Sequence, residues 1–168
     1  ENNMADLKVT IREELTLNGY DQGAKNTLTI SDIDEVFKRI VTCPANNETT
    51  IARFRSSVGN ASGTATFDSA LDVQDVKYVR VTNLDSSNSL TLSLQVEVGE
   101  DDSGADTSTS LLVESGKSFM LSSPHDGIGA VASGSYNANL VTDLVDLDSL
   151  VVQPGSNSVD VEVYVASA

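Results

Sequence analysis

The sequence predicts an all-β fold, an antiparallel β-sandwich or jelly-roll-like arrangement, in a single domain over residues 1–168 with residues 1–5 as a loose N-terminal tail. Valine occurs 20 times, threonine 14 times and tryptophan not at all. Branched side chains are stiff at Cβ and fit a pleated, half-buried surface. Short stretches of alternating apolar and polar residues recur along the chain, separated by turn residues, as is typical of sandwiches and barrels. A chain of 168 residues is long enough to bury one core.

The first expected element is a hairpin. Residues 6–17 alternate apolar and polar side chains, with an interruption at Glu13-Glu14, which predicts one strand with a bulge or two short strands. Asn18-Gly19 supplies the two residues with positive φ that a tight hairpin turn requires. Residues 27–30 are the next expected strand.

Residues 32–42 are open between strand and helix. Ser31 followed by Asp34 has the spacing of a capping box, and the apolar residues after it fit helical spacing, which predicts one short helix. Residues 36–42 also form a good β run, ended by Pro44, and strands are expected on both sides. The strand is favoured, and the short helix near 32–42 remains the alternative.

The rest of the chain continues the strand pattern. Loops are expected over residues 56–66 and 99–110, and strands over 49–54, 76–82, 89–98, 110–113, 117–121, 139–141, 150–153 and 159–165. Because successive strand residues point to opposite faces, one set of alternating residues is predicted to point into the core together. This set is Leu90, Leu92, Leu94, Val96, Val79, Val81, Val161 and Val163.

The charge distribution argues against two classes of partner. The formal net charge is −15. Residues 1–80 hold 9 Lys/Arg and 12 Asp/Glu, and residues 81–168 hold 1 and 13, so the two parts carry −3 and −12. Nucleic acid and anionic membranes would be repelled by such a chain. No apolar run approaches the roughly 20 residues that span a bilayer, and the sequence after Met4 leads us to expect no signal peptide.

No group of residues has the pattern of an active site, so we expect no enzyme, no catalytic residue, no cofactor and no metal. The single histidine, His125, lies in a Pro-His-Asp-Gly stretch typical of a surface turn, without a nucleophile elbow. Cys43 has no second cysteine and is expected to be an inert thiol. Carboxylates cluster at residues 100–102 with Asp106, and at Asp143, Asp146 and Asp148. These clusters lack the ordered ligand spacing of a calcium loop, so solvated acidic loops are expected.

Two stretches carry a resemblance to a known group of proteins. Residues 78–94 form a strand, an Asn83-Leu84-Asp85 turn and a second strand, and residues 111–121 place a glycine turn before an aromatic strand. This pattern, with residues 151–157 before the last strand, resembles virion structural proteins of tailed bacteriophages, such as head decoration β-sandwiches, over about half of the chain.

The resemblance implies a non-catalytic capsid decoration or stabilising protein, made in the host cytoplasm and located in the virion. It implies homo-oligomers that fold without disulfides and bind a major capsid or other virion protein. A tail or neck component is the alternative within this group. The alternatives outside it are a carbohydrate-binding or adhesive module, for which exposed aromatics are few, and a β-barrel enzyme, for which one histidine is too few.

Basic residues from three expected strands form the partner-docking hypothesis. Neighbouring strands lie about 4.8 Å apart, so side chains on them converge if their faces agree. On an acidic molecule such a patch would attract an acidic partner surface. The competing interpretation is that these residues pair with nearby carboxylates in weak surface ion pairs. The residues are Lys38, Arg39, Arg53, Arg55, Lys77 and Arg80.

Overall fold

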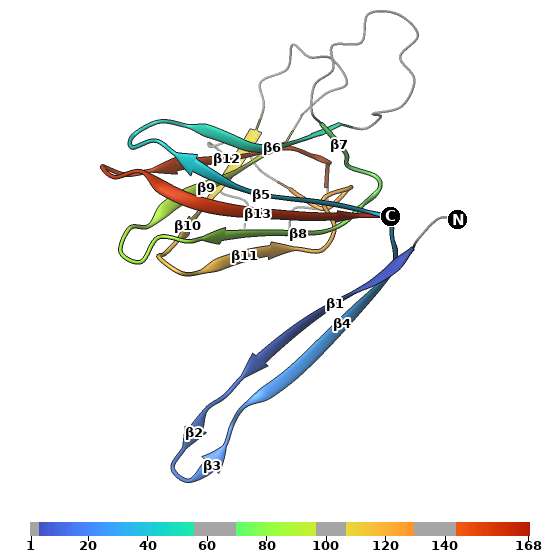
Figure 1. The fold of residues 1–168 in the computed structure, drawn as a ribbon, viewed down its shortest axis with the longest axis vertical. Coiled ribbons are helices and arrows are strands. Elements are labelled where there is room, and N and C mark those ends of the chain that lie inside the picture. The colour runs from blue at the N-terminus through green and yellow to red at the C-terminus, as the bar shows by residue number, and fades with distance from the viewer. Residues whose placement is uncertain (1–3, 56–69, 97–106, 130–143) are drawn as a thin grey trace, which may run out of the picture.

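In a computed structural model the chain forms a β-sandwich from which a long β-hairpin projects (Figure 1). The structure describes residues 4–55, 70–96, 107–129 and 144–168. The all-β prediction is confirmed, because every regular element in these ranges is a strand. The strands are β1 (Ala5–Glu13), β2 (Thr16–Leu17), β3 (Tyr20–Asp21), β4 (Ala24–Ile33), β5 (Glu35–Cys43), β6 (Thr49–Arg55), β7 (Leu71–Asp72), β8 (Val76–Asn83), β9 (Leu90–Val96), β10 (Thr107–Val113), β11 (Ser118–Leu121), β12 (Leu147–Pro154) and β13 (Val159–Ser167).

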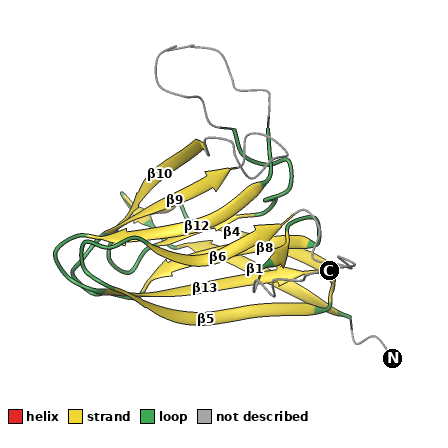
Figure 2. Cartoon of the chain, turned by 90° about the horizontal axis from the view of Figure 1, so that it is seen from above, coloured by secondary structure: helices red, strands yellow, loops and turns green. Residues whose placement is uncertain are grey.

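The sandwich consists of a four-stranded sheet in the order β11-β8-β13-β5 and a five-stranded sheet in the order β10-β9-β12-β6-β7. Figure 2 shows β10, β9 and β12 side by side, and β13 and β5 side by side in the other layer. The pairings are antiparallel except the short parallel pair of β6 and β7. The last strand, β13, lies between β5 and β8, so the four-stranded sheet forms only when distant parts of the chain pair.

The main core lies between the two sheets, and the eight residues that the alternation predicted to be inside are all buried. Their exposed fractions do not exceed 5%. Leu92, Val81 and Val161 are fully covered at 0%. The period of two residues therefore identified the inner faces of β8, β9 and β13 correctly.

Residues 32–42 contain the end of β4 and most of β5, separated by Asp34, and the helix alternative is wrong. Asp32 adopts a φ of 65°, a left-handed conformation that a continuous right-handed helix excludes. After it, β5 pairs with β13 along its whole length, from Glu35 opposite Ser167 to Cys43 opposite Val159. This ladder satisfies the backbone groups of β5 that face β13, so tertiary pairing outweighs the local helical spacing.

Two predicted boundaries differ from the structure, and several predicted elements lie outside the described residues. Residues 107–110 belong to β10 rather than to a loop, because they pair with β9. Ala5 is the first residue of β1 rather than part of a tail, because it pairs with Ile33, and residues 1–3 lie outside the described part. The loop at 56–66, the polar stretch at 99–106 and the strand at 139–141 also lie outside it. The described ranges contain no helix of the length and apolarity needed to cross a membrane.

The first four strands form the projecting hairpin, which we call the arm (β1 to β4). The predicted turn is present, since Asn18 and Gly19 have φ of 52° and 82°, and Leu17 pairs with Tyr20 across it. The predicted interruption is also present, because β1 ends at Glu13 and β2 begins at Thr16. The expectation of one sandwich did not foresee that these strands would lie outside it (Figure 1).

Candidate interaction surface

The arm has one apolar and one polar face. Directly opposed residues of an antiparallel pair share a face, and the face alternates along each strand. The opposed pairs of the apolar face are Leu7–Ile30, Val9–Leu28 and Ile11–Asn26. Those of the polar face are Lys8–Thr29, Thr10–Thr27 and Arg12–Lys25, and the hydroxyls of Thr10 and Thr27 lie 3.2 Å apart.

At its base the apolar face of the arm packs on the sandwich in a second, small core. Tyr78 and Tyr164 meet there edge to face, with ring centroids 6.1 Å apart at 68°. Burial raises the pKa of the Tyr78 phenol. The cluster consists of Ile33, Tyr78 and Ala166 with Leu7, Val9, Ile30, Tyr164 and Ala168 around them. It anchors the arm on the face of the four-stranded sheet that points away from the main core.

Farther out, the apolar face of the arm is uncovered. The exposed fractions of the apolar side chains from Ile11 and Leu28 to the tip lie between 41% and 73%, the highest being that of Tyr20. A two-stranded ribbon is only marginally stable alone in water, and a contiguous exposed apolar patch marks an interaction site. These residues are Ile11, Leu15, Leu17, Tyr20 and Leu28. The distal arm is therefore suited to contact with a protein partner.

The sheet face at the base of the arm is also partly uncovered. We call it the outer face: the side of the four-stranded sheet that carries Tyr78 and Tyr164. The register places Val36 opposite Ala166, Ile40 opposite Glu162 and Met120 opposite Arg80 on this face. Val36, Ile40 and Met120 have exposed fractions between 43% and 61%. Alternation places these residues on strands, but it does not reveal which apolar face is left open.

A compact charged group lies in the middle of the outer face. Glu162 accepts a hydrogen bond from the Arg80 guanidinium, and the Lys38 ammonium lies 3.3 Å from its other oxygen. The Arg80 hydrogen bond, supported by Lys38, lowers the pKa of Glu162. Arg80 also lies over the ring of Tyr164, at 5.9 Å from its centroid. Two cations therefore share one carboxylate beside the aromatic anchor of the arm.

The six residues of the docking hypothesis are not all on this face. The structure brings Lys38 and Arg80 together at Glu162, although they come from β5 and β8, on opposite sides of β13. Arg53 and Arg55 are on β6 in the other sheet.

The other residues of the docking hypothesis make contacts away from Glu162. Arg55 lies 3.7 Å from Asp148. Arg39 lies 4.5 Å from the centroid of the Phe37 ring, on the side opposite to Lys38. The Lys77 ammonium donates to the Gln74 carbonyl at 3.3 Å.

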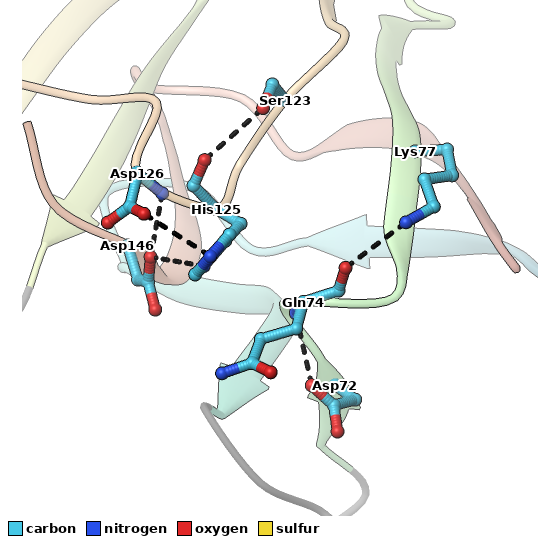
Figure 3. A network of polar contacts seen from close by, with 7 residues as sticks. All are labelled: Asp72, Gln74, Lys77, Ser123, His125, Asp126 and Asp146. Atoms are coloured by element: carbon cyan, nitrogen blue, oxygen red, sulfur yellow. Dashed lines mark hydrogen bonds and ion pairs between the residues drawn. The ribbon is translucent and has the colours of Figure 1, made fainter.

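His125 lies in a carboxylate-lined turn (Figure 3). Its Nδ1 is 2.9 Å from Asp146 and its Nε2 is 3.3 Å from Asp126. The meeting of His125 with Asp146 could not be predicted from the sequence, because the bridge between Ile128 and Val145 that joins the two segments has no local signal.

The chemistry open to this turn is narrow. Ser123 donates its hydroxyl hydrogen bond to the His125 backbone carbonyl rather than to the ring, so it is not arranged as an activated nucleophile. Within the described ranges, His125, Asp126 and Asp146 are the group whose ligand atoms, within 4.8 Å of one another, could hold a metal ion. The Asp146 carboxylate accepts a hydrogen bond from the Asp126 N–H at 2.8 Å. This bond closes the turn and explains why Asp146 lies beside His125.

Cys43 is a buried thiol at the end of β5. Its side chain is fully covered, and burial raises the pKa of the thiol. No disulfide involves it.

Comparison with known proteins returned no match among protein-family models, curated proteins or solved structures.

Proposed function

We propose that this chain is a non-catalytic structural protein of a tailed-phage particle, a capsid decoration or stabilising protein that binds the shell or its own copies. The observation that carries the proposal is the arm, whose distal apolar face is exposed on a projecting ribbon. A ribbon of this kind gains its stability when a partner covers it. Function through assembly explains why such a face is present in a chain that also encloses a well-buried core between its two sheets.

Two further features support assembly. The sandwich core is closed between its sheets, so the arm is not needed to complete it. The net charge of −15 favours solubility at the high local concentration at which virion proteins assemble. The sequence resemblance to phage virion β-sandwiches supplies the kind of particle, and the arm supplies the means of attachment.

The test has two parts. Light scattering of the purified full chain is expected to give a defined multiple of the 17.7 kDa protomer. In particles purified from cells carrying the gene in its native genome, mass spectrometry is expected to find the chain in a fixed ratio to the shell protein. Its presence in head fractions indicates decoration, and in tail fractions a tail or neck role. A monomer that is absent from every particle fraction contradicts the proposal.

A further inference from the structure

We propose that the distal arm of one copy lies, apolar face down, on the outer face of the four-stranded sheet of a second copy. This inference rests on the proposed function, because it names the partner and the surface through which the chain assembles.

The base of the arm already shows the contact that we infer. There, Leu7 and Ile30 of the apolar face pack beside Tyr78 and Tyr164 of the outer face within one chain. The same arm face continues outward through Ile11 and Leu28, and the same sheet face continues sideways through Ile40 and Met120. Both continuations are exposed. One chain therefore carries both halves of an apolar contact that it makes only in part.

The chain does not complete this contact with itself. Beyond its base the arm leads away from the sandwich, so its distal face does not lie over its own sheet (Figure 1). The distal apolar residues of the arm and those of the outer face are available together only when two copies meet.

The dimensions of the two surfaces agree. At about 3.3 Å per residue, the eight residues from Thr10 to Leu17 span about 26 Å. β5 has nine residues, which at the same rise is about 30 Å. A distal arm is therefore long enough to cross the part of a neighbour's outer face that the neighbour's own arm leaves open.

The charges of the two surfaces are also complementary. Residues 13–23 at the tip contain Glu13, Glu14 and Asp21 and no Lys or Arg, and the nearest cation, Arg12, pairs with Glu14. The centre of the outer face holds Lys38 and Arg80 with Glu162 between them, and Asp160 lies toward one end of the same face, opposite Thr42. The acidic tip is attracted to the two basic groups at the centre of this face.

A second copy is the occupant that these features favour. Each copy offers one arm and one outer face, so repeated docking closes a ring where the rotation between copies allows it, and reciprocal docking closes a dimer in which two arms are exchanged. In such a closed ring or dimer, every distal arm and every outer face is covered.

The test is cross-linking between chains. Two single variants, Ile11→Cys and Ile40→Cys, are made in a Cys43→Ser background, mixed and treated with a short bismaleimide. Both positions are exposed, so both variants fold. We expect a cross-linked dimer of the two different chains in the mixture. The matched control replaces Ile11→Cys with Thr10→Cys, one residue away on the polar face of the arm, and is expected to give at least tenfold less of this dimer.

The outcomes separate the inference from the proposed function. If light scattering shows oligomers but the Ile11→Cys and Ile40→Cys chains do not link, the arm docks elsewhere, and the inference is overturned while the proposed function stands. If Ile11→Cys chains link preferentially to each other, two arms lie side by side. This result also overturns the inference and leaves the proposed function standing. A chain that remains monomeric overturns the inference as well as the self-association on which it rests.

Discussion

At the scale of single residues, Asn83 joins the two sheets. It is fully buried at the end of β8. Its amide donates to the carbonyl of Asn88 at 2.8 Å and to that of Val113 at 3.1 Å, and its oxygen accepts the Asp85 N–H at 3.0 Å. Because Asn83 ends β8 of the four-stranded sheet and Val113 ends β10 of the five-stranded sheet, this side chain joins the two layers and also holds the turn after β8.

Substituting Asn83→Leu is expected to lower the free energy of unfolding by about 2–3 kcal/mol, because buried backbone groups lose their partners. Asn157→Ala is the matched control, since Asn157 is exposed and bonds only the side chain of Asn88 in the described structure. The control is expected to change stability by less than about 0.5 kcal/mol. Urea denaturation measures both, and equal effects would contradict the role assigned to Asn83.

Glu162 predicts a pH-dependent contribution to stability. Its pKa is lowered in the fold, chiefly by the hydrogen bond from Arg80 and also by Lys38, so its contribution is present above the unfolded-state pKa and is lost as pH falls through the folded one. Glu162→Gln is expected to lower the free energy of unfolding by at most about 1 kcal/mol at neutral pH.

Chemical denaturation at about pH 7 and about pH 3 measures this effect, on either side of the ordinary glutamate pKa of about 4.3. The difference between the wild type and Glu162→Gln is expected to shrink at the lower pH, because the wild-type carboxyl gains its proton. A difference that grows as pH falls would show that the ion pairs do not stabilise the fold.

Sequence patterns correctly predicted the burial or the turn position of residues for which local alternation and turn chemistry decide it. Leu92 and Val161 were assigned to the core by alternation, and both are buried. The turn after β8 was also expected, and Asp85 closes it by accepting the N–H groups of Ser87 and Asn88, which lowers the Asp85 pKa. The bond from Asn83 to Val113 could not be predicted, because it depends on how the two sheets meet.

At the scale of elements, Gly23 allows the chain between β3 and β4 to lie close against the backbone of Glu13. A Cβ atom at this position would lie 2.4 Å from the backbone oxygen of Glu13, so Gly23→Ala must push the two strands apart. We expect faster amide hydrogen exchange in the distal arm and an unchanged melting temperature of the sandwich. Gly155→Ala is the control, because its Cβ would meet no atom within 4 Å. Unchanged exchange in the arm would contradict this account.

The arm also marks the limit of prediction from periodicity. The alternation of Leu7, Val9 and Ile11 and the Asn18-Gly19 turn correctly predicted a hairpin. Alternation reports that one face of a strand is apolar, but it does not report whether that face meets the chain's own core or another molecule. The arm therefore could not be distinguished from a sandwich strand until its neighbours were known.

At the scale of the whole molecule, the unequal charge of the two parts of the sequence does not become two separate halves of the fold. The four-stranded sheet places β5, from the less acidic part, beside β13, from the strongly acidic part, and the five-stranded sheet places β6 beside β12. The six basic residues of the docking hypothesis are close in the sequence, but the fold distributes them over both sheets. Long-range pairing decides this arrangement, and composition along the chain carries no signal for it.

The central claim is that the protein acts by self-association through the apolar face of its arm, and light scattering of two matched variants tests it most directly. Ile11→Asp with Leu28→Asp places two charges on the apolar face, and Thr10→Asp with Thr27→Asp places two charges at neighbouring positions on the polar face. We predict that the first variant is a 17.7 kDa monomer and that the second assembles like the wild type, both with the melting temperature of the sandwich unchanged. Assembly of the first variant at wild-type strength would contradict the claim.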